Sequence, residues 1–169
     1  MIGIVDENGR FICKQLAKSK LMNDYYLAGG TALALQLRHR RSLDLDFFQN
    51  DTAERIPLNR IANELKSLFG EKSVRLSFKQ MDQATWFIKD TKVTFMSYPF
   101  NLLYPLKKGA EINPELLGLW LANPREIGAM KAYAMGRRAV FRDYIDLYFI
   151  LRNEITNLAA IIEDARRKF

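Results

Sequence analysis

The sequence predicts a single α/β domain whose C-terminal portion is helical. Three observations support this prediction. One segment, residues 25–48, passes from a strand pattern through a glycine turn and a helix pattern to a second strand. Further strand-like runs lie between residues 74 and 98, and helical patterns fill the chain after residue 122. A chain of 169 residues is long enough to bury one core. We therefore expect residues 1–122 to form the α/β core and residues 123–169 to pack on it as helices.

The elements of the first part follow from local hydrophobic patterns. In chain order these predict a helix over residues 11–22, a strand over 25–28, a helix over 31–37, a strand over 43–48 and a helix over 57–69 that ends at Gly70. Strands are then predicted over residues 74–78, 85–89 and 93–98, with Asp90-Thr91 as the hairpin turn between the last two. Prolines at 99 and 105 make the next stretch irregular, and residues 116–121 fit either a short strand or the start of a helix.

The second part shows clear helix signals. Asn123-Pro124-Arg125-Glu126 places Asn at the N-cap, Pro at the first helical position and Glu at the third, and this helix is expected to end at Gly136. A second helix over residues 142–151 is expected to bury one stripe, made of Tyr144, Leu147, Tyr148 and Leu151. Thr156 is expected to cap a last helix that ends at Lys168.

Composition excludes several classes of protein. No apolar run approaches the roughly 20 residues that span a bilayer, and the first residues lack the pattern of a signal peptide. We therefore expect a cytoplasmic protein with no membrane partner. Cys13 is the single cysteine, so no internal disulfide forms, and the sequence has no Cys/His cluster for zinc. The net charge of +7 favours polyanionic partners, from nucleotides to RNA, although many domains are mildly basic without one.

A glycine turn and two aspartates mark residues 25–48 as the candidate site. Gly29 and Gly30 lie between a strand and a helix, where backbone N–H groups can approach an anion. Thr31 can cap that helix or offer its hydroxyl to a phosphate. Asp44 and Asp46 are two positions apart on a predicted strand, so their side chains share one face, roughly 6.5–7 Å apart.

Each half of this pattern also has an ordinary explanation. The aspartates fit an edge strand with a solvated face opposite Leu43, Leu45 and Phe47, and a tight strand-to-helix turn needs glycine in any case. The combination is more specific, because two carboxylates in apolar surroundings repel each other unless a cation lies between them. Mg²⁺ is the expected cation, with Mn²⁺ as the substitute, since Mg²⁺ is held by one or two carboxylates together with substrate phosphates.

The order of these motifs resembles the nucleotidyltransferase-like AbiEii/AbiGii toxin family, which belongs to the DNA polymerase β-type nucleotidyltransferase superfamily. The resemblance is carried by residues 29–33 (GGTAL), 42–48 (SLDLDFF) and 130–151 (MKAYAMGRRAVFRDYIDLYFIL). It implies a small mixed β-sheet of the nucleotidyltransferase fold, flanked by helices. It also implies an enzyme that uses Mg²⁺ to transfer a nucleotide from an NTP to an RNA, tRNA in particular, or to a protein hydroxyl. Such an enzyme would be the toxin of a bacterial toxin–antitoxin or abortive-infection system, with a cognate antitoxin as partner.

The resemblance also assigns roles in the helical portion. Lys131 would contact the NTP phosphates together with Arg137, and Asp143 or Asp146 would help to orient these basic residues. Asp143 is accordingly placed with Gly29, Gly30 and Thr31 in the nucleotide-binding set, and Asp44, Asp46 and Lys131 in the catalytic set. The alternative is an ordinary lysine with an ion-pair network that includes Arg142 and Asp146.

A basic cluster precedes the aspartates. Arg38, Arg40 and Arg41 could grip a phosphate backbone or form a solvated basic turn, and His39 fits a turn residue better than a catalytic base.

One position departs from the superfamily pattern. The superfamily carries a third carboxylate on a later strand, where this chain has Thr94, and threonine cannot act as a general base. The acceptor hydroxyl is then activated differently, or the domain is a catalytically weakened one that binds nucleotide or antitoxin. A plain RNA-binding module is a third possibility, which the Asp44/Asp46 pair disfavours because carboxylates repel a phosphate backbone.

Overall fold

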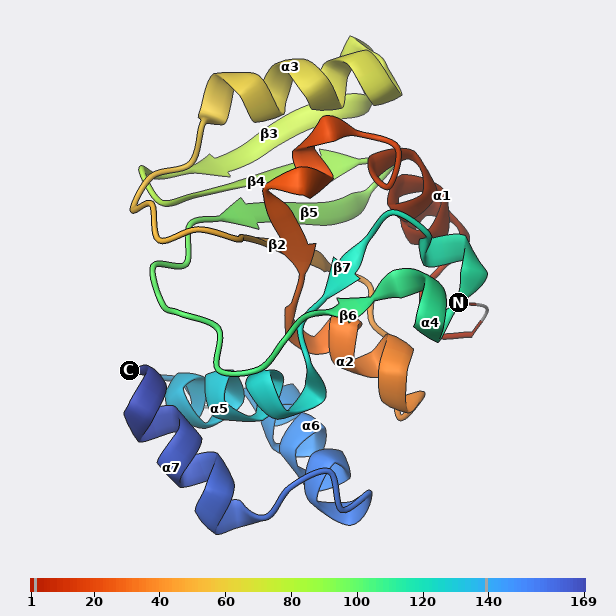
Figure 1. Ribbon diagram of the computed structural model, residues 1–169. Helices are drawn as coiled ribbons and strands as arrows, with labels where there is room; N and C mark the ends of the chain where they lie inside the picture. The colour runs from red at the N-terminus through yellow and green to blue at the C-terminus, as the bar shows by residue number, and fades with distance from the viewer. Residues whose placement is uncertain (2, 139) are drawn as a thin grey trace.

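The computed structural model describes residues 1, 3–138 and 140–169, and these form one seven-stranded mixed sheet with helices packed around it (Figure 1). The strands are β1 (Tyr25–Leu27), β2 (Leu45–Gln49), β3 (Val74–Lys79), β4 (Gln83–Ile88), β5 (Thr91–Met96), β6 (Lys107–Lys108) and β7 (Trp120–Leu121). The helices are α1 (Glu7–Leu16), α2 (Gly29–Leu37), α3 (Leu58–Phe69), α4 (Gly109–Ile112), α5 (Pro124–Met135), α6 (Phe141–Arg152) and α7 (Leu158–Lys168). Short 3₁₀ turns cover Lys20–Asn23, Glu71–Ser73 and Pro114–Leu116. The predicted fold class, α/β with a mixed sheet and a helical C-terminal portion, is confirmed.

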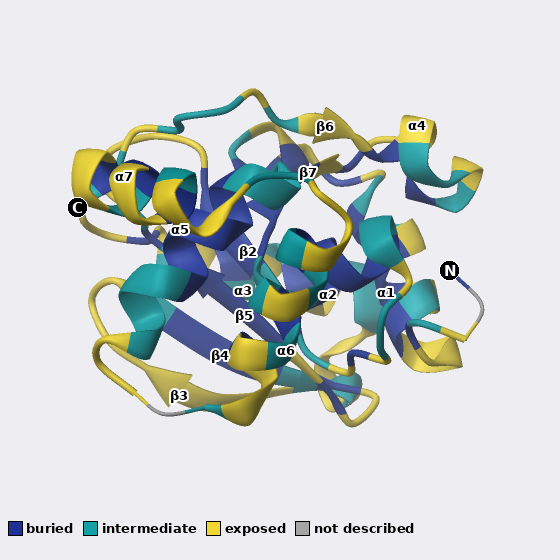
Figure 2. Cartoon of the chain, turned by 90° about the horizontal axis from the view of Figure 1, so that it is seen from below, coloured by how far each residue is buried: buried dark blue, intermediate teal, exposed yellow. Residues whose placement is uncertain are grey.

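The sheet has the order β3-β4-β5-β2-β1-β7-β6. β2 is parallel to β5 and antiparallel to β1. The strand that precedes Gly29, β1, and the strand that carries Asp46, β2, therefore lie side by side in the middle of the sheet. The core beneath them is aromatic: the Phe95 ring stacks on Phe47 and meets Tyr25 and Trp86 edge-on. The central strands are buried whereas the edge strand β3 is exposed along most of its length (Figure 2). The helices α5, α6 and α7 gather at one end of the molecule, away from α3 (Figure 1).

Most local predictions agree with these elements. Helix α3 buries Ile61 and Leu65 and ends at Gly70, and α5 has Asn123 as its N-cap, with the side chain accepting a hydrogen bond from the Arg125 N–H. The stretch between the two prolines contains no helix or strand among its residues 99–105, all of which are described. Residues 116–121 end in the two-residue strand β7.

The first, second and last helices begin at other residues than predicted. Helix α2 begins at Gly29 and not at residue 31. The first helix begins at Glu7, where the Asp6 carboxylate accepts a hydrogen bond from the Gly9 N–H, and it already ends at Leu16. The last helix is capped by Asn157, whose side chain accepts from the Ala160 N–H, and Thr156 lies outside it.

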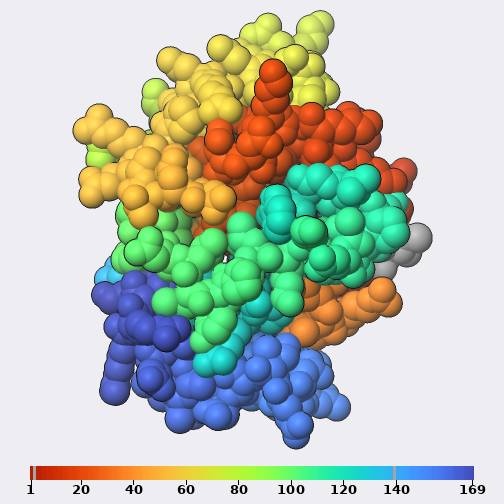
Figure 3. Space-filling view, viewed as in Figure 1, coloured from red at the N-terminus to blue at the C-terminus, as the bar shows by residue number. Residues whose placement is uncertain are grey.

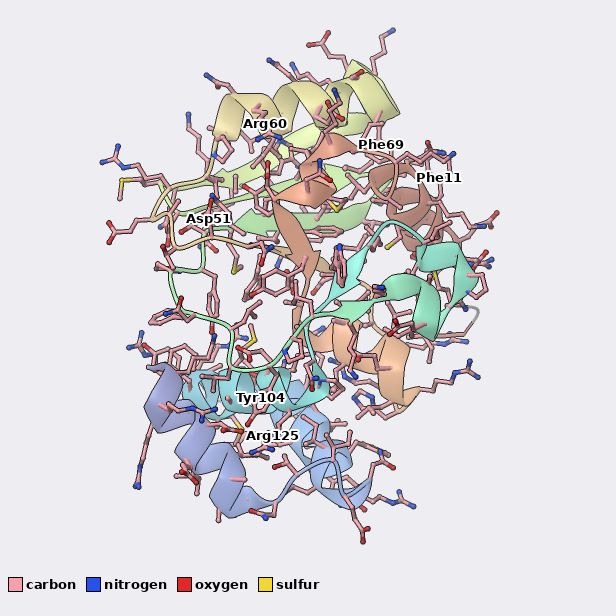
Figure 4. The ribbon with its side chains drawn as sticks, viewed as in Figure 1. Phe11, Asp51, Arg60, Phe69, Tyr104 and Arg125 are labelled. Carbon is pink, nitrogen blue, oxygen red and sulfur yellow. The ribbon has the colours of Figure 1, made fainter. Side chains whose placement is uncertain are left out.

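The position of Glu126 at the third residue of α5 suggested a capping box with Asn123, but Glu126 does not form one. Its buried carboxylate accepts hydrogen bonds from the N–H groups of Leu103 and Tyr104 and lies 2.6 Å from Nζ of Lys168. Arg125 beside it lies 4.6 Å over the Tyr104 ring (Figure 4). The irregular stretch after β5 is therefore fastened to α5 and α7.

The stripe predicted to be buried on α6 is only partly correct. Leu147 and Leu151 pack against the core, but Tyr144 and Tyr148 are about half exposed. The buried residues of this helix are Asp143, Asp146 and Ile150. The two carboxylates are tolerated inside because Arg40, from the segment after α2, and Lys131 of α5 lie against them.

Within the described part of the chain, each helix is too short or too polar to cross a membrane.

Candidate active site

A cavity of about 830 Å³ lies between the sheet and the helices α5 and α6. One wall is the start of α2 with β2, the floor is the outward face of β4 and β5, and the other wall is α5 with the start of α6. The residues from the predicted motifs that line it are Gly29, Gly30, Thr31, Asp44, Asp46, Thr94, Lys131 and Asp143. The structure therefore brings together motifs that are up to about a hundred residues apart in the sequence.

The glycine pair is fitted closely to the residues around it. Gly29 has φ +61°, and a Cβ atom there would lie 3.0 Å from Oδ2 of Asp46. A Cβ at Gly30 would lie 2.0 Å from Nη2 of Arg40. Helix α2 starts at Gly29 without a side-chain cap, so its first N–H groups remain available to an anion in the cavity.

Thr31 does not cap α2, so that expectation is wrong. It lies inside the helix and is 1% exposed. Its hydroxyl donates to the main-chain carbonyl of Asp44 and contacts the Ser42 hydroxyl at 2.7 Å. Thr31 thereby ties the start of α2 to the segment that carries the aspartates.

The two aspartates differ in their surroundings. Asp46 lies on β2, whereas Asp44 lies just before the strand with a side chain that is 33% exposed and 3.8 Å from Nη1 of Arg142. Leu45 and Phe47 are buried as predicted, but Leu43 is 59% exposed because the strand starts only at Leu45.

The pKa of Asp46 is raised, mainly by its burial and then by the neighbouring Asp44 carboxylate. Lys92 and Lys131 lower it in part but do not cancel these effects. The nearby cations therefore do not fully offset the burial of Asp46 and its repulsion by Asp44.

Thr94 occupies the place beside Asp46. The two residues are directly in register between the parallel strands β2 and β5, and Thr94 lies 3.1 Å from the Thr85 hydroxyl of β4. Among the described residues that line the cavity, the acids are Asp44, Asp46 and Asp143.

Lys131 reaches the cavity from α5, with a side chain that is 11% exposed. Its ammonium donates to Asp143 and lies 3.0 Å from Asp146, the two acids of α6. Asp146 also accepts two hydrogen bonds from Arg40 and contacts Nε2 of His39 at 2.8 Å. Burial alone would raise the pKa of Asp146, but these hydrogen bonds and the Lys131 charge together hold it well below its usual range.

Several basic residues lie elsewhere than predicted. His39 lies in the segment between α2 and β2, as predicted, but its side chain is fully buried against Asp146. The expected ion pair between Arg142 and Asp146 is replaced by the contact of Arg142 with Asp44. Arg137 packs over the Tyr133 ring, and Arg138 lines the cavity in its place.

The cavity floor lies outside the motifs that the sequence predicted. Gln83, Thr85 and Phe87 line the cavity, and they alternate with buried Ala84 and Trp86. This alternation was the signal that could have shown which face of β4 is functional.

The cavity residues fit a Mg²⁺ ion whose coordination is completed by phosphates and water. The residues described here contain no group of three or more His, Cys, Asp or Glu side chains arranged to hold a metal. Two carboxylates whose repulsion the nearby cations do not fully offset, next to the free N–H groups of α2, are what a magnesium–nucleotide complex requires. Asp44 and Asp46 would hold the ion.

Comparison with known proteins identifies the family. The model of the nucleotidyl transferase AbiEii toxin of type IV toxin–antitoxin systems matches residues 10–111, more than half of the chain. The chain belongs to the AbiEii nucleotidyltransferase toxin family. The resemblance inferred from the motifs is therefore confirmed. This AbiEii-family chain is also 32% identical over 151 residues to an uncharacterized protein of Aquifex aeolicus (strain VF5), covering 88% of this chain and 68% of that protein.

Solved nucleotidyltransferases share the fold of this AbiEii-family chain. ANT(2″)-Ia in complex with adenylyl-2″-tobramycin matches with a TM-score of 0.62 and 13% identity, over 92% of this chain and 94% of that one. A putative nucleotidyltransferase from H. pylori matches with a TM-score of 0.53 and 20% identity, over 95% and 74% of the two chains. The Megavirus polyadenylate synthase matches with a TM-score of 0.58 and 13% identity, over 86% of this chain but only 31% of the synthase.

The Gly29→Ala variant is expected to lose about 1–2 kcal/mol of folding free energy, because a side chain is strained at this positive φ and its Cβ presses on Asp46. Urea unfolding measures the loss. Gly136→Ala is the matched control, since Gly136 has φ −66° and its added Cβ would meet its nearest atom only at 3.5 Å. Equal stability of the two variants would contradict the strain at Gly29.

The raised pKa of Asp46 predicts an unusual pH dependence. Mg²⁺ binding is expected to weaken as the pH falls through this raised pKa, at a higher pH than for an ordinary carboxyl. Folding stability changes in the opposite direction: it falls as the pH rises from the ordinary pKa of 3.8 through the raised pKa, because the folded state disfavours the charged form. An NMR titration of the carboxyl carbons measures the pKa. Asp44→Asn should lower it, and an unchanged value would show that the neighbouring charge is not a cause.

Proposed function

We propose that this protein is a Mg²⁺-dependent nucleotidyltransferase that transfers a nucleotide from an NTP to a hydroxyl group of RNA. A tRNA is the preferred acceptor and a protein hydroxyl the other one, and the protein acts as the toxin of a toxin–antitoxin system with a cognate antitoxin. The observation that supports this most is the position of Asp44 and Asp46 in one cavity with the free N-terminus of α2 and with Lys131.

Each group has a distinct task in this proposal. The N–H groups at Gly29 and Gly30 bind phosphate oxygens at the start of α2. Lys131 uses two of its three N–H donors on Asp143 and Asp146, which fixes its position and leaves one donor for a phosphate. Arg138, also at the cavity, adds a second positive charge. In this division residues 1–122 supply the metal ligands and residues 123–169 supply the cations.

The reaction needs stabilisation of negative charge on the leaving group. The acceptor hydroxyl oxygen bonds to the phosphorus of the transferred nucleotide as the bond to pyrophosphate breaks, and the hydroxyl proton passes to water. A Mg²⁺ ion held by Asp44 and Asp46 would supply positive charge that stabilises the leaving pyrophosphate. Lys131, already ordered in the cavity, needs little reorganisation to neutralise the same charge.

A second candidate function is nucleotide or antitoxin binding without efficient transfer. Thr94 favours it, because its hydroxyl lies in register with Asp46, where a third carboxylate would share the same face, and it cannot take the acceptor proton.

Incorporation of labelled nucleotides separates the two candidates. The purified protein is incubated with each of the four labelled NTPs and Mg²⁺, with total cellular RNA in one set and total protein in another. Label in RNA that is absent with EDTA, and absent with Asp46→Asn, is the expected result. Nucleotide binding without label in either set would contradict transfer and support the binding function.

A further inference from the structure

Helix α6 buries its acidic side chains and exposes its aromatic ones. Asp143 and Asp146 are 1% and 0% exposed, whereas Phe141, Tyr144 and Tyr148 are 76%, 49% and 56% exposed. Buried charges and exposed large apolar side chains are the two informative departures from the usual distribution. The first departure is explained by the cations around the aspartates. The second departure, the exposed aromatic side chains, is not explained by contacts within this chain.

The three rings form a stripe. Their spacing of three and four residues places them on one side of the helix, about 4.5 and 6 Å apart along its axis. Across the described residues, neither Phe141 nor Tyr144 contacts another aromatic ring, and the one ring near Tyr148 is Phe149, at 5.3 Å on the same helix. The stripe thus consists of three separate side chains that are exposed to solvent. It belongs to the end of the molecule that the C-terminal helices form (Figure 3).

Arginines flank the stripe. The side chains of Arg138 and Arg142 are 63% and 60% exposed, and Arg152 is exposed at the other end of the helix. Between residues 136 and 157 the exposed acid is Glu154, since Asp143 and Asp146 are buried. The surface of α6 therefore combines planar rings with positive charge.

The stripe is continuous with the cavity. Val140 and Arg142, on either side of Phe141 in the sequence, both line it, and Arg142 lies 3.8 Å from Asp44. A ligand lying along α6 from Tyr148 towards Phe141 would reach the aspartate pair with its end.

We propose that the stripe Phe141–Tyr144–Tyr148, with Arg138, Arg142 and Arg152, binds single-stranded RNA and leads its end into the cavity. Exposed rings stack on unpaired bases of any sequence, and arginines near them neutralise the phosphates. An RNA fits better than an apolar protein partner because exposed arginines lie at both ends of the stripe, Arg138 and Arg142 at one end and Arg152 at the other. This inference rests on the proposed function, in which an RNA hydroxyl is the acceptor.

Fluorescence anisotropy with a labelled single-stranded RNA of about twelve nucleotides tests the stripe, without NTP or Mg²⁺. The double variant Tyr144→Ala/Tyr148→Ala is expected to bind about tenfold more weakly or worse. Tyr144→Phe/Tyr148→Phe keeps the ring faces and is expected to bind like the wild type. Trp120→Ala, which removes an exposed ring of β7 that lies outside the stripe, is the matched control. Arg152→Gln should reduce the salt dependence of binding by about one charge.

Several results would overturn the inference. Equal RNA affinity of the wild type and the double alanine variant would do so, and so would equal affinity for a double-stranded RNA, whose paired bases cannot stack on the rings. A wild-type dimer that the alanine variant converts to a monomer, with RNA affinity unchanged, would assign the stripe to a second copy of the chain. Failure of the proposed function gives a different result. RNA binding that depends on the rings, without nucleotide transfer by the wild type, would support the stripe as an RNA-binding surface and contradict the proposed enzyme activity.

Discussion

Asp46→Asn is expected to reduce nucleotide transfer by about a thousandfold or more, which corresponds to about 4 kcal/mol of transition-state stabilisation. The change keeps the size of the side chain and removes one of the two charges that would hold Mg²⁺. Because folding raises the pKa of Asp46, the charged carboxylate is less favourable in the folded than in the unfolded protein, and the neutral amide should fold at least as stably as the wild type. The expected result is thus lost activity without lost stability.

Label transfer and urea unfolding, measured on the same preparation, check this expectation. Asp82→Asn is the matched control, since Asp82 is exposed and is not among the cavity residues. Transfer that survives in Asp46→Asn would show that the aspartate pair is not the metal site. A large loss of stability would instead show that the carboxylate holds the fold.

Asp146→Ala is expected to lose about 3–5 kcal/mol of folding free energy, because it removes the shared partner of Arg40, His39 and Lys131 and leaves buried charge uncompensated. The lowered pKa adds a pH signature. The carboxylate contributes stability above its ordinary pKa of 3.8, and this contribution is lost as the pH falls towards the lowered value. The difference between wild type and variant should therefore shrink in acid.

Urea unfolding at pH 7 and at pH 3 measures both effects. Asp146→Asn keeps an acceptor for the hydrogen bonds and should lose less stability, which provides a measurable variant if the alanine form does not fold. Glu71→Ala removes an exposed ion pair with Lys66 and should leave the unfolding midpoint unchanged. A loss in Asp146→Ala as small as in this control would mean that the buried cations find other partners.

Features that depend on neighbouring residues in the chain could be predicted from the sequence. Examples are the Gly29-Gly30 turn, the Asn123 cap of α5 and the end of α3 at Gly70. These features depend on backbone conformation and local hydrogen bonds, so the residue types at these positions predict them. The spacing of Asp44 and Asp46 is likewise visible in the sequence. The family resemblance came from these local motifs in their order along the chain.

The orientation of α6 and the roles of the buried charges could not be predicted in this way. Amphipathic periodicity predicts that the aromatic residues of α6 form its buried face. It contains no information about Lys131, Arg40 and His39, which neutralise the two buried aspartates of α6 in the folded protein. Arg40 and His39 lie more than a hundred residues from Asp146 in the sequence. The sequence by itself determined the local elements and the candidate motifs. The tertiary structure decided which side of α6 faces the protein, because burying a carboxylate depends on which cations the fold places beside it.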